Sequence, residues 1–224
     1  ERLGATRLLR AAKNRFGSTD EVGVLEMRGS GLVEVPDASR FFLERDQPPA
    51  PGSAVTVAVE GSRPLAVEIQ ALVAPAGYGS PRRAVNGIDQ NRVLMLIAVL
   101  ARHAGLNLTG HDVYVNVAGG LRIDEPAVDL AAAAALASSL RAVPVAPATA
   151  LVGELSLSGR VRAAGRLEAR VAEAGRLGFG RIISGPADAS RGDAHRRMTG
   201  PGGRPQVVTV ADVRSALDTA LATG

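Results

Sequence analysis

The chain has 224 residues, of which 46% are hydrophobic and 21% charged, a composition typical of a soluble globular protein. It has no cysteine, which excludes disulfides, cysteine nucleophiles and thiolate metal sites, and its three histidines do not have the spacing of metal ligands, so we expect no metal site. The net charge of +4 and a pI near 10.5 favour an anionic partner.

No apolar run approaches the roughly 18 residues of a membrane span, so we expect no membrane partner. The chain begins Glu1-Arg2-Leu3, without a Met and without an apolar signal region, which favours a fragment of a longer protein. The absence of cysteine is consistent with the cytosol, and we expect a cytoplasmic location.

Residues 1–47 form the first expected unit. Alternating apolar residues predict strands over residues 6–10 and 22–27, then a turn and a third strand over 32–35. The Pro-rich segment 47–52 cannot continue a strand or helix, and we interpret it as a linker. A second unit is expected over residues 52–224.

This second unit alternates strands with helices, which predicts an α/β (α+β) fold. Residues 184–205 are expected to be a mobile loop. Strict alternation of apolar residues predicts that the unit opens with a hairpin of two strands, 55–59 and 65–69. Further strands are expected over 113–117, 151–157, 161–163, 181–183 and 207–210. Helices are expected over 89–104, 167–177 and 211–221, together with an alanine-rich helix that opens at Pro126.

Three motifs carry a family resemblance: Gly119-Gly120, the helix opening Asp124-Glu125-Pro126-Ala127, and the segment from Gly165 to Arg170. Their order and spacing are similar to those of the proteolytic domain of the Lon protease family. In that family a serine nucleophile opens the helix and a lysine serves as its base. Aligned without a gap, the serine falls on Ala127 and the lysine on Arg170. The resemblance implies a Lon-like fold without its dyad.

The chemistry of the two residues supports the same conclusion. The only lysine of the chain is Lys13, far upstream, so 25 of its 26 basic residues are arginine. A Ser-Lys dyad needs an amine that can lose its proton, and arginine stays charged in proteins. Ala127 offers no nucleophile, and Ser138 and Ser139 lie at the far end of the same expected helix. We therefore expect no peptidase activity.

A second motif, Lys13-Asn14-Arg15-Phe16-Gly17, resembles the Lys-Asn-Arg-Phe-Gly motif of the RadA (Sms) family of bacterial DNA repair proteins. The resemblance extends over nearly the whole chain. It implies that residues 1–47 are the end of a RecA-like ATPase core and that 52–224 are an inactive Lon protease-like domain. It also implies a homohexameric ring, an ATP-driven role in recombination and branch migration, and a recombinase of the RecA type as a partner.

The resemblance assigns Lys13 and Arg15 to the ATP of a neighbouring subunit, as in an arginine finger. The alternative is two solvated cations near the end of a strand. The chain has no Walker A loop, so we expect no ATP hydrolysis and no cofactor in this fragment, with ATP and Mg belonging to the full-length protein.

Arginines on loops and turns are the candidates for DNA, single-stranded or branched, because guanidinium groups are permanent donors to phosphates. In the loop from Tyr78 to Arg83, Tyr78 could stack on a base. The basic run His195-Arg196-Arg197 is a less specific candidate. The predicted DNA-binding residues are Arg82, Arg83, Arg92, Arg160, Arg162 and Arg166. For each group, solvated surface charge is the alternative.

We interpret the chain as the DNA-binding and ring-assembly part of a RadA-type protein. A purely structural scaffold that holds ATPases together without touching DNA is the main alternative. A residual peptidase is a third hypothesis, and the missing dyad argues against it.

Overall fold

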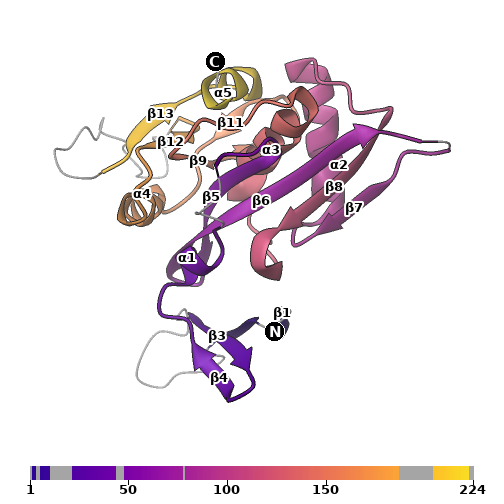
Figure 1. Cartoon of the computed structure of the whole chain (residues 1–224). Helices are drawn as coiled ribbons and strands as arrows, with labels where there is room; N and C mark the ends of the chain where they lie inside the picture. Colours follow the sequence, from indigo (N-terminus) through magenta and orange to yellow (C-terminus); the bar gives the residue numbers. More distant parts are fainter. Residues whose placement is uncertain are drawn as a thin grey trace.

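A computed structural model describes residues 2–3, 6–10, 22–43, 48–77, 79–186 and 204–221. The predicted residues Lys13, Arg15 and Tyr78, the run 195–197 and most of the expected loop 184–205 lie outside these ranges. Two β-sheets organise the described part of the chain, a small N-terminal one and a larger one covered by helices (Figure 1).

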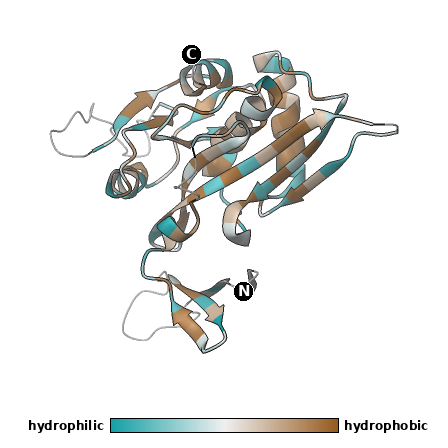
Figure 2. Ribbon diagram, viewed as in Figure 1, coloured by the Kyte–Doolittle hydropathy of each residue, from teal (hydrophilic) through white to brown (hydrophobic). Residues whose placement is uncertain are grey.

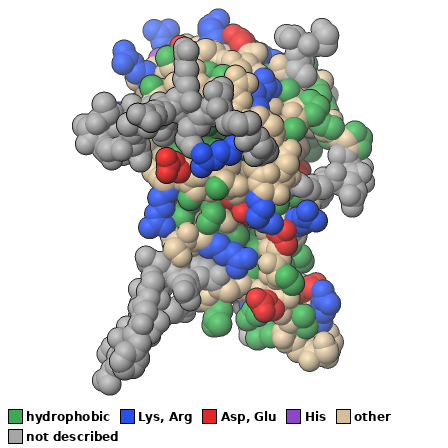
Figure 3. All heavy atoms as spheres, turned by 90° about the vertical axis from the view of Figure 1, so that its left-hand side faces the viewer, with side chains coloured by type: hydrophobic (Ala, Val, Ile, Leu, Met, Phe, Trp, Pro, Cys, Tyr) green, Lys and Arg blue, Asp and Glu red, His purple; other side chains and the backbone are tan. Residues whose placement is uncertain are grey.

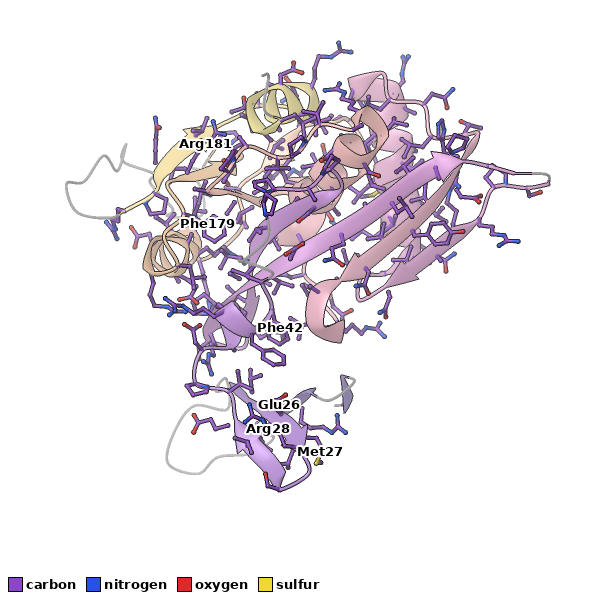
Figure 4. All side chains as sticks on the ribbon, in the orientation of Figure 1. Glu26, Met27, Arg28, Phe42, Phe179 and Arg181 are labelled. Carbon is purple, nitrogen blue, oxygen red and sulfur yellow. The ribbon has the colours of Figure 1, made fainter. Side chains whose placement is uncertain are left out.

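The small sheet is antiparallel, with its strands in sequence order. The strands predicted over 6–10 and 22–27 are confirmed, and the third begins at Gly31, whose φ of +108° suits glycine in the turn after Arg28. An exposed ion pair joins Arg28 to Glu26 on this sheet (Figure 4). The strands are β1 (Arg2–Leu3), β2 (Thr6–Arg10), β3 (Val22–Arg28) and β4 (Gly31–Glu34).

A short helix, α1 (Ala38–Phe41), follows the small sheet and packs on the larger one. Ser39 is buried, accepts a hydrogen bond from the Ala66 backbone N–H at 3.0 Å and donates one to Glu173. Phe42 points from the end of this helix toward the body, where it lies so close to Gly119 that a Cβ there would sit 2.4 Å from the ring (Figure 4). Ala38 and Phe42 are therefore part of the larger core, while Phe41 between them is exposed.

The larger sheet has seven strands in the order β13-β12-β9-β5-β6-β8-β7. Strands β13, β12, β9 and β5 are parallel neighbours, β6 is antiparallel to both β5 and β8, and β7 is parallel to β8. Their bounds are β5 (Ser53–Glu60), β6 (Arg63–Pro75), β7 (Arg83–Asn86), β8 (His111–Val117), β9 (Thr149–Val152), β12 (Arg181–Ser184) and β13 (Gln206–Thr209).

Helices cover both faces of this sheet, and the α/β class expected from the sequence is confirmed. One core contains side chains of α2 (Gln90–Val99), α3 (Asp129–Arg141) and α5 (Val213–Ala220). A second core lies between α4 (Leu167–Arg176) and β5, β9 and β12. Figure 2 shows hydrophobic residues along the strands and helices that enclose these cores.

Helix α3 is buried over residues 129–138, and five successive alanines, 131–135, let it approach β5 and β6 closely. Its opening differs from expectation: Pro126–Val128 forms a 3₁₀ turn, η3, before the α-helix starts at Asp129. The helix predicted over 89–104 also changes type, since Leu100–Ala104 is a π-helical turn, η1, that ends at Gly105 with φ of +70°.

The remaining elements are short. A two-stranded antiparallel hairpin, β10 (Glu154–Leu155) and β11 (Val161–Arg162), follows β9, and a 3₁₀ turn, η2 (Ala118–Gly120), follows β8. Strand β7 has no counterpart among the predicted strands, and its first residue, Arg83, lies in the predicted loop, because four residues are too few for alternation to be recognised. No helix among the described residues is long and apolar enough to cross a membrane.

Candidate functional site

The opening of α3 is the position of the expected nucleophile. Ala127 lies in η3 with 5% of its surface exposed, and its carbonyl accepts a hydrogen bond from the Gly153 N–H at 2.8 Å. The Gly153 carbonyl in turn accepts a hydrogen bond from the Leu130 N–H at 3.1 Å. These two bonds hold the segment against the end of β9. The side chain at position 127 is a methyl group, which cannot act as a nucleophile.

Arg170, at the position of the expected base, faces this segment from α4. Its side chain is 4% exposed, and Nη1 and Nη2 donate to the two carboxylate oxygens of Glu125, each at 2.8 Å. Nη1 also donates to the Val57 carbonyl at 2.5 Å and Nε to the Gly165 carbonyl at 2.9 Å. The fold therefore brings residue 170 next to residues 125–127, but as a charged structural donor that cannot accept a proton.

A second arginine–carboxylate pair holds the same helix start. Arg92 donates from Nε and Nη2 to the two oxygens of Asp129, both at 2.5 Å, and the Leu155 N–H donates to Asp129 at 3.0 Å. Asp129 is fully buried. Its hydrogen bonds to Arg92 raise the pKa of that guanidinium above its ordinary value. Arg92 is predicted to contact DNA, but two of its nitrogens are already bonded to Asp129 inside the protein.

The two arginines before β7 have different surroundings. Arg83 donates from its guanidinium to the carbonyls of Leu108 at 3.0 Å, of Arg82 at 2.9 Å and of His111. These bonds fix the loop to β8. Arg82 is exposed, and its backbone N–H donates to Asp112 at 2.7 Å. Of this pair, the Arg82 side chain is the one that faces solvent.

Arg160 and Arg162 lie at the β10–β11 hairpin, as the alternation predicts. Both are exposed, and Val161 between them is buried. The backbone is held on both sides, because Val161 N–H donates to the Ala211 carbonyl at 3.0 Å and Arg160 forms an isolated bridge with Asp212. The two guanidinium groups therefore project from a fixed stretch of backbone.

Arg166, the remaining predicted residue, precedes α4. Its φ is +56°, and Nη1 donates to the Gly61 carbonyl at 2.7 Å, so it joins α4 to the β5–β6 turn. The structure does not place all candidates in one cluster, since Arg82 lies at the edge strand β7 and Arg160 lies beside α5. The described residues contain no group of three or more His, Asp or Glu side chains that could hold a metal ion.

Two arginines that the sequence analysis did not single out, Arg102 and Arg214, are exposed near the same hairpin. Arg214 lies on α5, and its Nε donates to the carbonyl of His103 at 3.4 Å, across 111 positions of sequence. No local pattern relates these positions, so sequence reasoning had no signal with which to group them.

Comparison with known proteins adds two findings. Residues 77–188, half of the chain, match the family model described as subunit ChlI of Mg-chelatase, and this part of the chain belongs to that domain family. The DNA repair protein RadA of Bacillus subtilis (strain 168) is 48% identical over 221 residues, which are 99% of this chain and 47% of that protein. The chain belongs to the RadA family.

Other RadA proteins agree with this assignment. RadA of Listeria monocytogenes serovar 1/2a is 51% identical over 183 residues, 82% of this chain and 40% of that protein. RadA of Streptococcus pyogenes serotype M1 is 48% identical over 192 residues, 86% of this chain and 42% of that protein. The chain thus spans less than half the length of these curated relatives. The predicted relationship to RadA is confirmed.

Proposed function

We propose that this RadA-family chain binds the phosphate backbone of DNA, single-stranded or branched, on behalf of an ATP-dependent recombination and repair protein. One observation carries the proposal: Arg160 and Arg162 are exposed on either side of buried Val161, on a hairpin fixed by backbone hydrogen bonds. Guanidinium groups presented in this way meet phosphate oxygens as charged, planar donors. Arg82 is a further exposed candidate.

We also propose that residues 52–224 are a Lon protease-like domain without peptidase activity. Ala127 and Arg170 support this, because a methyl group cannot attack a carbonyl and Arg170 is already occupied by Glu125. The buried pairs Arg170–Glu125 and Arg92–Asp129 stabilise the helix opening at which the proteolytic family has its nucleophile.

For the whole protein, we propose a homohexameric ring with branch-migration activity, driven by ATP and Mg and working with a recombinase of the RecA type. Residues 1–47 would complete the ATPase core, with Lys13 and Arg15 reaching the nucleotide of a neighbouring subunit. In the full-length protein, Arg15→Ala and Lys13→Ala would then lower ATP turnover while leaving nucleotide binding largely intact, because such groups act on the transition state. Normal turnover in both variants would exclude this role.

A salt titration tests DNA binding directly. If roughly 4–6 phosphates are neutralised on a duplex, log K against log[salt] should slope by about −4 to −5. The variant Arg160→Gln/Arg162→Gln should reduce the magnitude of the slope by about 2, since each lost phosphate contact contributes about 0.9. The matched control is Arg28→Gln/Arg122→Gln, which removes two exposed arginines that each pair with a nearby carboxylate.

The outcomes separate the two hypotheses. A weakened slope in the hairpin variant with an unchanged control supports DNA contact by the hairpin. No binding by the parent chain at low salt would favour the alternative, a structural scaffold that holds ATPases together. Equal slopes in parent and hairpin variant would move the DNA contact away from Arg160 and Arg162.

A further inference from the structure

The C-terminal end of α2 departs from regular α-helical geometry. Residues Leu100–Ala104 form the π-helical turn η1, which ends at Gly105 in the left-handed conformation. Leu100 and Ala104 are buried, while Arg102 between them is exposed. A turn of this type that closes on a left-handed glycine is a common way for a helix to end. It places His103 against the β10–β11 hairpin, with the exposed Arg102 as its neighbour in the chain.

His103 lies directly against the turn of the hairpin. Its Nε2 is 3.0 Å from the carbonyl oxygen of Leu157, within hydrogen-bonding distance. Gly159 has φ of +76°, and a Cβ at this position would lie 2.6 Å from Cγ of the His103 ring. The ring therefore occupies the space that any larger residue at 159 would need. This contact fixes the hairpin relative to η1.

Helix α5 contacts the same two elements. Its first residue, Val213, donates its N–H to the Gly159 carbonyl at 2.8 Å, and Arg214 donates from Nε to the His103 carbonyl at 3.4 Å. Arg160 is bridged to Asp212, the N-cap of α5. Arg102, Arg160 and Arg214 thus come from three segments that meet around His103. In Figure 3, Lys and Arg side chains lie at the top of the molecule, the end that carries α5, and also over the middle of the same face.

The carboxylate of Asp212, next to these arginines, already accepts hydrogen bonds within α5. Asp212 accepts hydrogen bonds from the Ser215 N–H at 2.8 Å and the Ser215 hydroxyl at 3.0 Å, which cap α5 and lower the pKa of the carboxyl below its ordinary value. Within the described residues, no carboxylate forms an ion pair with Arg102, Arg160 or Arg214. Arg102, Arg160 and Arg214 are all exposed, and Arg214 has Asp212 as a neighbouring charge.

We propose that Arg102 of η1 and Arg214 of α5 extend the DNA-phosphate surface of the hairpin, so that one nucleic-acid backbone runs over β10–β11, η1 and α5. This inference rests on the proposed function, since it assigns two more contacts to the same ligand. Nucleic acid fits better than an acidic peptide, because arginines spread over three rigid segments match a continuous row of phosphates.

The test is the salt dependence of DNA binding by Arg102→Gln/Arg214→Gln, measured on the same duplex as the parent and the hairpin variant. Two lost contacts should reduce the magnitude of the slope of log K against log[salt] by about 2. Combined with Arg160→Gln/Arg162→Gln, the reductions should add to about 4. The control Arg28→Gln/Arg122→Gln should leave the slope unchanged. Far-UV circular dichroism confirms that each variant remains folded.

Failure of this inference is distinguishable from failure of the proposed function. If the hairpin variant has a reduced slope and Arg102→Gln/Arg214→Gln has the parental slope, DNA binding stands and its extension over η1 and α5 is overturned. If the parent does not bind DNA, the proposed function and its extension both fall. A reduction of similar size in the Arg28→Gln/Arg122→Gln control would show a general charge effect and would also overturn the assignment.

Discussion

Arg170 and Glu125, separated by 45 positions in the sequence, face each other through two parallel hydrogen bonds of 2.8 Å. Glu125 also accepts a hydrogen bond from the Val59 N–H at 2.7 Å, so the pair joins α4 and β5 to the segment that opens α3. A planar guanidinium suits this bidentate geometry better than an ammonium group does. Arg170 is thus part of the structural framework of the domain.

Arg170→Met should therefore destabilise the protein. The remaining Glu125 carboxylate is 25% exposed and keeps its bond from the Val59 N–H, so we expect a loss of about 2 kcal/mol, less than for a fully buried pair. The double variant Glu125→Gln/Arg170→Met should recover part of this loss, since no carboxylate then remains unpaired. Urea unfolding curves of the two variants and the parent measure the difference. A loss below about 0.5 kcal/mol would show that the pair is not important for stability.

Introducing the dyad residues of the Lon protease family should not create a peptidase. In Ala127→Ser/Arg170→Lys, the new lysine would lie beside the Glu125 carboxylate, which favours its charged form and keeps it from acting as a base. Incubation with casein and with a serine-reactive fluorophosphonate probe should show no signal above the parent. Cleavage that scales with the amount of purified variant would contradict this.

Arg92→Gln should affect stability rather than DNA affinity. The substitution leaves Asp129 buried without its charged partner, and we expect a loss of about 3 kcal/mol in the free energy of unfolding. The salt slope of DNA binding should remain parental at temperatures where the variant is folded. Arg82→Gln is the informative comparison, because its exposed side chain should change the slope with little effect on stability. If Arg92→Gln changed the slope and Arg82→Gln changed only the stability, Arg92 would be the DNA contact and Arg82 the structural residue.

The ion pair between Asp37 and Arg176 should make stability depend on pH in the acid range. Hydrogen bonds from Arg176 lower the pKa of Asp37 to about 2 from its model-peptide value of 3.8. A lowered folded-state pKa contributes stability above the unfolded-state value, and this contribution is lost as pH falls toward the folded-state value. Asp37→Asn should therefore flatten the fall in melting temperature between about pH 4 and about pH 2. If the melting temperature fell equally in the parent and in Asp37→Asn, the ion pair of Asp37 would not be a source of the pH dependence.

Ala142→Gly should stabilise the chain. Ala142 ends α3 in the left-handed conformation with φ of +52°, which costs a residue with a Cβ about 1 kcal/mol relative to glycine. The matched control is Ala137→Gly, inside the same helix, which should destabilise by a similar amount because glycine loses more freedom there. Thermal unfolding of both variants shows whether each substitution raises or lowers the melting temperature. A lower melting temperature for Ala142→Gly would contradict the assigned strain.

The sequence by itself was sufficient for features that depend on neighbouring residues. The alternation of β5 and β6 predicts the hairpin because alternate residues of a strand share a face, although the fold buries both faces of these strands. Gly178 marks the end of α4 because it takes a positive φ. The prediction that the chain has no peptidase activity also rests on side-chain chemistry, since alanine is no nucleophile and arginine cannot act as a base.

Only the tertiary structure decided which arginines face solvent. Arg92 is 37 positions from Asp129, and Arg83 is 25 from the Leu108 carbonyl, so sequence spacing could not distinguish these internal donors from the exposed Arg82 and Arg160. The contact between His103 at the end of α2 and Gly159 of the hairpin is likewise a tertiary feature that no local pattern indicates. A guanidinium group can serve a carbonyl, a carboxylate or a phosphate equally well, and the fold determines which of these acceptors it reaches.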